Sequence, residues 1–173
     1  MTLDPHKKAW LVTVMLVVLG VASWINHVND YEIAIPLFLF YAVLVINTHF
    51  SIILFSSLVP HENKVQTALD LILFALYVYL IVREEGLQWF FFYVTLLFCI
   101  ASIKYTHLLN ELDQPKLLKR KITWDALGML LALVTLGGIM SGYVVTSLWF
   151  CSIAFLIANI YLLFINPLYK KDS

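Results

Sequence analysis

The stretch Ile33–Leu54, IAIPLFLFYAVLVINTHFSIIL, decides the class of fold. It has 22 residues, and none of them is Asp, Glu, Lys or Arg. A helix needs about 20 mostly apolar residues to cross the ~30 Å hydrocarbon core of a bilayer. The strict apolar–polar alternation that is typical of a transmembrane β-strand is not found here. The stretch therefore predicts a transmembrane helix.

The composition of the whole chain agrees with this interpretation. Of its 173 residues, 62% are hydrophobic and only 13% are charged. Soluble domains are nearer one-half apolar and one-quarter charged. Because the formal net charge is zero, no basic excess favours binding to phosphate, and we expect no nucleic-acid partner. Because the composition is too apolar for a soluble domain, we do not expect a water-soluble enzyme either.

Working outward from Ile33–Leu54, five further apolar runs have a similar length. Short turns follow the first, third and fifth runs, whereas longer charged connections follow the second and fourth. We predict an all-α integral membrane protein with one polytopic domain over residues 1–173 and six transmembrane helices paired as three antiparallel hairpins. The predicted spans are approximately 9–25, 33–54, 67–82, 87–108, 122–140 and 143–165.

Basic residues are distributed unequally between the two predicted sides of the membrane. Nine lie on the side of the termini and of the loops at 61–66 and 110–121, whereas Arg83 is alone on the other side. The nine are Lys7, Lys8, Lys64, Lys116, Lys119, Arg120, Lys121, Lys170 and Lys171. This bias predicts cytoplasmic N- and C-termini in the cell (inner) membrane. Alternatively, residues up to about Ser23 are a cleaved signal peptide, which would leave five helices.

Two interpretations of an internal repeat stay open. Lys8, Lys64 and Lys121 are spaced 56 and 57 residues apart, and each precedes the first helix of a predicted hairpin. This spacing predicts three copies of a two-helix unit. The simpler interpretation is six helices of similar length with basic residues at their cytoplasmic ends.

Seven Asp, Lys, His or Asn side chains lie inside the predicted spans. They are Asn47, His49, Asp70, Lys104, His107, Asp125 and Asn159. Ionisable groups at membrane depth are costly and point to function. We predict that these residues form a polar cavity in the cytoplasmic half, with Lys104 paired to Asp70 or Asp125. The alternative is structural: the carboxylates lie near helix N-termini, Lys104 and His107 extend toward the inner surface, and the asparagines bond between helices.

Helical geometry limits which of these side chains can meet. Asn47 and His49 are about 200° apart on a helix, so they cannot both point into one cluster. Asp125, Gly128, Ala132 and Thr135 form a face of small residues that a neighbouring helix could approach closely. Ser152, Asn159 and Asn166 form a polar stripe at heptad spacing.

The function that these features favour is a small transporter, channel or solute-binding protein, in which Asp70 or Asp125 binds a cation or exchanges a proton while Lys104 is the counter-charge. One alternative is a non-catalytic subunit or sensor that binds a partner protein or a second copy of itself. Another is a b-type haem protein for electron transfer, with His49 and His107 as axial ligands.

Motifs of enzymes and cofactors are not found in the sequence. It has no phosphate-binding glycine loop, no HExxH and no GxSxG, so we predict neither catalytic residues nor a metal site, and no cofactor other than the alternative haem. Gly138–Gly142 contains GxxxG, which we attribute to helix packing or a turn. Cys99 and Cys151 lie in apolar runs, where structural thiols are expected.

Overall fold

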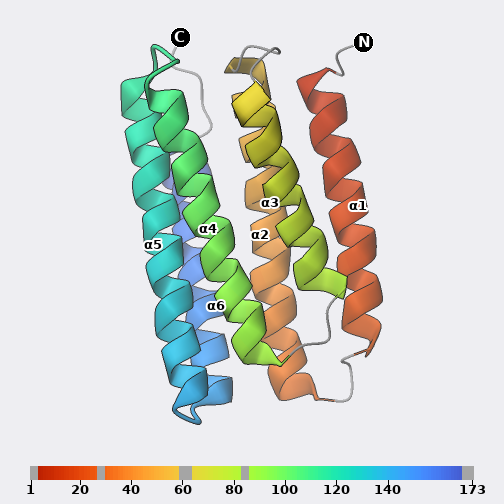
Figure 1. The fold of residues 1–173 in the computed structure, drawn as a ribbon. Helices are drawn as coiled ribbons and strands as arrows, with labels where there is room; N and C mark the ends of the chain where they lie inside the picture. Colours follow the sequence, from red (N-terminus) through yellow and green to blue (C-terminus); the bar gives the residue numbers. More distant parts are fainter. Residues whose placement is uncertain (1–3, 27–29, 59–63, 83–85, 169–173) are drawn as a thin grey trace. The chain divides into compact units, whose positions relative to one another are not determined.

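The fold was analysed in a computed structural model, which describes residues 4–26, 30–58, 64–82 and 86–168. Over these ranges the chain is all-α, with six helices and no sheet, as predicted (Figure 1). The helices are α1 (Pro5–Asn26), α2 (Tyr31–Leu58), α3 (Lys64–Val82), α4 (Leu87–Leu109), α5 (Pro115–Met140) and α6 (Val144–Ile160), which a short π-helix, η1 (Tyr161–Ile165), continues.

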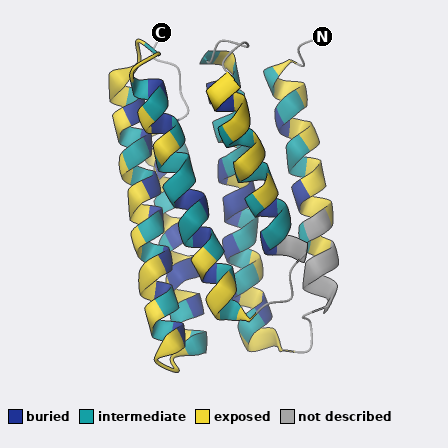
Figure 2. Ribbon diagram, in the orientation of Figure 1, coloured by how far each residue is buried: buried dark blue, intermediate teal, exposed yellow. Residues whose placement is uncertain are grey.

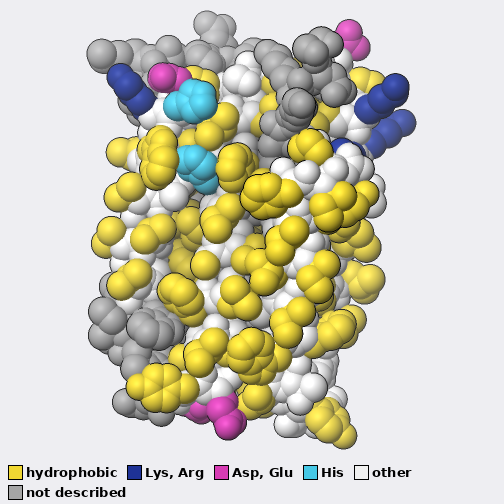
Figure 3. Space-filling model, turned by 180° about the vertical axis from the view of Figure 1, so that it is seen from behind, with side chains coloured by type: hydrophobic (Ala, Val, Ile, Leu, Met, Phe, Trp, Pro, Cys, Tyr) yellow, Lys and Arg dark blue, Asp and Glu magenta, His cyan; other side chains and the backbone are white. Residues whose placement is uncertain are grey.

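Four of the helical segments are long and apolar enough to cross a membrane: Tyr31–Leu58, Leu87–Leu109, Pro115–Met140 and Val144–Ile165. Large apolar side chains are exposed along the helices, for example Leu71 (64%), Leu130 (56%) and Ile157 (61%). Figure 2 shows exposed positions throughout the described parts of the helices, and on the face seen in Figure 3 hydrophobic side chains predominate between the helix ends. This distribution is the reverse of a water-soluble bundle, whose exposed faces are polar.

The helices extend beyond the predicted apolar runs, most clearly at α5. Residues 110–121 were expected to form a loop, but α5 begins at Pro115, so this prediction is wrong for its second half. Proline suits the first position of a helix because its φ angle is fixed at a helical value and its missing N–H would have no partner there. Hydropathy marks where the bilayer core begins, whereas a helix can start several residues earlier among lysines.

Contacts within the chain divide it into two compact units, which are described separately. Unit 1 comprises residues 1–61 and 148–173, and unit 2 comprises residues 62–147. In unit 1, α1 and α2 pack against each other in opposite directions, and α6 runs in the same direction as α2 (Figure 1).

Close approach of α1 and α2 depends on a glycine. A Cβ atom at Gly20 would lie 2.2 Å from Cε1 of Tyr41, so a larger residue would displace that ring. The hydroxyl of Tyr41 donates a hydrogen bond of 2.9 Å to the carbonyl oxygen of Leu16. The contact between α2 and α6 likewise combines an aromatic ring with a hydrogen bond from a hydroxyl to a backbone carbonyl. The Phe40 and Phe155 rings lie 4.9 Å apart, and Ser152 Oγ donates to the Pro36 carbonyl at 2.6 Å.

In unit 2, α4 packs against both α3 and α5. The buried residues of α5 recur at alternating intervals of three and four along the whole helix. They are Leu118, Lys121, Asp125, Gly128, Ala132, Thr135 and Ile139. A Cβ at Gly128 would lie 2.8 Å from Cε1 of Phe98 on α4, which confirms the predicted face of small residues. This stripe is the seam on which α4 packs.

The turn after α5 has the predicted glycine at its tightest point. Gly142 has a φ of +88°, in the left-handed region that favours glycine. A Cβ at Gly138 would lie 2.1 Å from Ser147 Oγ, so the GxxxG segment serves this turn and its local packing. Both cysteines are free thiols; Cys151 is buried, whereas Cys99 is half-buried.

Candidate functional site

Four charged side chains form a cluster in unit 2, where α3 begins, α4 ends and α5 begins. We call Asp70, Lys104, Lys121 and Asp125 the charged cluster. Lys104 Nζ lies 2.5 Å from Asp70 Oδ1, and Lys121 Nζ lies 2.5 Å from Asp125 Oδ1. The structure thus selects Asp70, of the two partners predicted for Lys104. Lys104 also interacts electrostatically with Asp125, which links the two ion pairs.

The Lys121–Asp125 pair lies on the buried stripe of α5. Residues four apart occupy the same face of a helix, so the two side chains meet without help from another element. Only 6% of the Lys121 side chain and 3% of the Asp125 side chain are exposed. Both charges occupy positions of the stripe where apolar residues would normally pack, and burial of charge is costly unless it is paired.

Asp125 lies deeper in its helix than the sequence indicated. Because α5 begins at Pro115, Asp125 is ten residues into the helix, or about 15 Å along its axis. The helix dipole acts within the first turn. The alternative that Asp125 is stabilised by the start of its helix is therefore wrong, and its partner is the Lys121 side chain.

The Asp70–Lys104 pair joins two helices and is more open to the surroundings. The Asp70 side chain on α3 is 41% exposed, whereas that of Lys104 on α4 is 11% exposed. Tyr105, which is buried, lies beside both lysines: its ring centre is 5.5 Å from Lys104 Nζ and 5.2 Å from Lys121 Nζ. An aromatic ring within about 6 Å of an ammonium group stabilises the positive charge.

His107 lies in the same unit with polar partners of its own. Its Nδ1 atom is 3.2 Å from Gln66 Nε2 on α3 and 3.3 Å from Glu111 Oε1. Nδ1 can accept a hydrogen bond from the Gln66 amide only when it is unprotonated, and can donate one to Glu111 only when it is protonated. The two contacts are therefore alternatives that depend on the protonation of one atom.

The three other predicted site residues belong to unit 1. His49 Nδ1 lies 2.8 Å from Thr13 Oγ1, and the Trp10 ring packs edge-on against the imidazole at 4.9 Å. Asn47 is buried, and the Asn159 amide donates to the Phe155 carbonyl of its own helix at 2.8 Å. Since the seven predicted residues are divided between the units, their convergence on one cavity stays a prediction. The haem interpretation also stays a prediction, because His49 and His107 lie in different units.

Sequence analysis missed Lys121 as a member of the site. It was counted with the basic residues of a loop, whereas it is buried and paired. The signal that could have found it is its position four residues before Asp125. Tyr105 and Gln66 were also missed, and their roles depend on how α3 and α4 are rotated, which the sequence does not specify.

Within the described residues, no group of three or more His, Cys, Asp or Glu side chains could hold a metal ion.

Comparison with known proteins gave no match among family models, curated proteins or solved structures.

Proposed function

We propose that this protein is a small multi-pass membrane protein that moves a proton or a small cation across the bilayer, with the charged cluster as its binding site. Asp70 and Asp125 bind the transported species, and Lys104 and Lys121 neutralise them when the site is empty. The observation that carries this proposal is the presence of two ion pairs on α3, α4 and α5.

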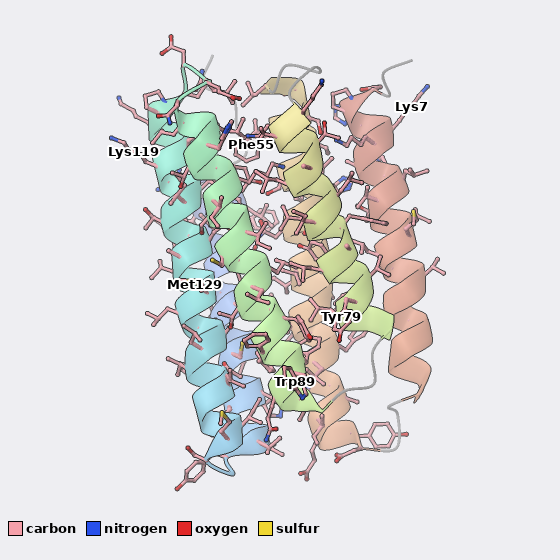
Figure 4. The ribbon with its side chains drawn as sticks, in the orientation of Figure 1. Lys7, Phe55, Tyr79, Trp89, Lys119 and Met129 are labelled. Atoms are coloured by element: carbon pink, nitrogen blue, oxygen red, sulfur yellow. The ribbon has the colours of Figure 1, made fainter. Side chains whose placement is uncertain are left out.

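The membrane part of the proposal is supported by four long apolar helices and by exposed apolar side chains along them. In the full arrangement that we propose, α1 and α3 also span, which gives six spans in three hairpins with both termini in the cytoplasm. In unit 2, Lys119 lies at the end where α5 begins, whereas Tyr79 and Trp89 lie at the opposite end (Figure 4). Basic residues favour the cytoplasmic side and aromatic residues favour interfaces, so the charged cluster lies toward the cytoplasm.

The transport part of the proposal is supported by the cost of charges at membrane depth. On insertion scales a Lys or Asp costs roughly 2.5–3.5 kcal/mol at the centre of a transmembrane helix, which is an upper limit for the charged cluster because the cluster lies toward the cytoplasm. Pairing offsets part of this cost, yet well-packed apolar residues are often as stable as a buried ion pair or more so. Four such residues are therefore more than packing requires, and a binding role accounts for them.

Ion flux into proteoliposomes tests the proposal. The purified full chain is reconstituted into vesicles that contain dyes for H⁺, Na⁺ and K⁺, and flux is started by an imposed membrane potential. We expect flux of one of these ions that is lost in both Asp70→Asn and Asp125→Asn. Asp113→Asn is the matched control, because Asp113 is exposed in the turn before α5. Flux equal to that of protein-free vesicles, or full flux in both variants, would contradict the proposal.

A further inference from the structure

The charged cluster is graded from an exposed carboxylate to a buried one. Side-chain exposure falls from 41% at Asp70 to 11% at Lys104, 6% at Lys121 and 3% at Asp125. Lys104 contacts Asp70 directly and interacts electrostatically with Asp125. The two carboxylates thus have different surroundings, and we expect them to have different roles.

Asp125 has one oxygen that is satisfied and one that is not. Oδ1 accepts a hydrogen bond from Lys121, whereas Oδ2 is buried and has no hydrogen-bond partner among the described residues. A buried acceptor without a donor loses its interactions with water and gains nothing in return. Oδ2 is therefore an acceptor that a bound proton would satisfy.

The surroundings of Oδ2 suit a proton better than a metal cation. Alkali and alkaline-earth cations need several oxygen ligands, whereas a proton needs one lone pair. Within the described residues, no group of three or more His, Cys, Asp or Glu side chains could hold a metal ion, and the charged groups that act on Asp125 are the ammonium groups of Lys121 and Lys104. Those ammonium groups would repel a metal cation, but an O–H bond at Oδ2 can form beside them.

We infer that Asp125 Oδ2 is a protonation site and that the species this protein transports is H⁺, which reaches Asp125 past Asp70. This inference rests on the function proposed above. A hydronium ion gives its proton to the Oδ2 lone pair, leaving water and a neutral carboxylic acid. Lys121 keeps its own proton and its hydrogen bond to Oδ1.

Protonation changes the charge of the cluster, and its other members accommodate the change. The net charge of the four groups rises from zero to +1, because the negative charge of Asp125 is lost. The Tyr105 ring, which lies within 5.2 Å of Lys121 Nζ and 5.5 Å of Lys104 Nζ, stabilises that excess positive charge. Loss of the proton restores the ion pair. The groups that respond to this charge from the neighbouring helices are thus Lys104 and Tyr105 on α4 and Asp70 on α3.

Labelling with dicyclohexylcarbodiimide tests the inference independently of flux. This apolar reagent enters the bilayer and adds to a protonated carboxylic acid, forming a stable N-acylurea that mass spectrometry locates in the chain. We expect the full chain in vesicles to be labelled at Asp125, more at acidic than at alkaline pH, and Na⁺ or K⁺ to give no protection. The adduct at this position is lost in Asp125→Asn and restored at the same position in Asp125→Glu.

Two matched variants separate Asp125 from other carboxylates. Asp70→Asn and Asp113→Asn are expected to keep the adduct at Asp125, since neither removes the buried acid. An unlabelled Asp125 in the wild-type chain would overturn the inference, and so would protection by Na⁺ or K⁺, which would identify a bound metal cation while leaving the proposed function intact. Labelling of Asp125 in a chain that gives no ion flux would instead refute the proposed function, and H⁺ transport with it, while Asp125 Oδ2 would stand as a protonation site.

Discussion

The two units of this protein use different polar interactions inside an apolar framework. In unit 1, several hydrogen bonds between uncharged groups end on backbone carbonyls, as those of Tyr41, Ser152 and Asn159 do. In unit 2 the polar interactions include two ion pairs, one of which is almost entirely buried. Neutral hydrogen bonds of this kind add modestly to helix packing, whereas buried charges are expensive. We therefore expect the polar groups of unit 1 to stabilise helix packing and the charged groups of unit 2 to bind the transported ion.

The largest effect that we expect comes from breaking the buried pair in unit 2. Lys121→Met leaves the Asp125 carboxylate buried without its counter-charge, and loss of one partner of a buried pair costs about 3–5 kcal/mol. The measurement is the free energy of unfolding of the purified chain in detergent. Lys116→Met is the matched control, because Lys116 is exposed on the same helix.

The double variant Lys121→Met, Asp125→Leu sharpens this result. Removing both charges leaves no uncompensated carboxylate, so most of the stability should return. If the single and double variants are equally destabilised, the ion pair is not the reason for the loss, and the contrast between the units would fail.

The second largest effect concerns the seam between α4 and α5. Gly128→Ala places a methyl group 2.8 Å from the buried Phe98 ring, and overpacking of this kind costs about 1–3 kcal/mol. Thermal unfolding of the purified chain measures the loss, and the added variant Phe98→Leu should restore part of it by making room. Gly137→Ala is the control, since its Cβ meets nothing within 4 Å. Equal effects at the two glycines would contradict the tight seam.

The third effect separates the two ion pairs of unit 2. Because the Asp70 side chain is 41% exposed, Asp70→Asn should cost only about 1 kcal/mol of stability, as exposed pairs do. If the charged cluster transports protons, the same variant should still lower proton flux strongly. A loss of stability as large as that of Lys121→Met would show that Asp70 is as structural as Lys121.

Much of this molecule could be predicted from its apolar runs. Uncharged stretches such as Ile33–Leu54 are long enough to cross a bilayer, and in lipid a helix satisfies all of its own backbone hydrogen bonds. The helical class and the order of the helices therefore follow from the sequence. The first residue of each helix was harder to predict. An apolar run ends at the first charged residue, whereas the backbone hydrogen bonds of the helix continue through charged residues. For this reason Lys121 was predicted to lie in a loop, whereas in the structure it lies on the buried stripe of α5.

The members of the site were easier to predict than their contacts. Asp70, Lys104 and Asp125 stood out because charges are rare within apolar runs, and Lys104 was expected to pair with one of the two carboxylates. The choice of Asp70 depends on the rotation of α3 about its axis, which apolar residues on all sides leave undetermined. For the same reason the Gln66 contact of His107 could not be foreseen.

The smallest effect that we expect is in unit 1. Ser152→Ala removes a hydroxyl that lies 2.6 Å from the Pro36 carbonyl and 2.8 Å from the Leu148 carbonyl of its own helix. One hydroxyl proton can serve only one of these carbonyls at a time, and interhelical hydrogen bonds in membranes are worth about 0.6 kcal/mol on average. Thermal unfolding should shift slightly, and ion flux should be unchanged, because this contact holds α6 against α2 and carries no charge. If Ser152→Ala lost flux while the protein stayed folded, unit 1 would also take part in transport. The proposed difference between the two units would then be wrong.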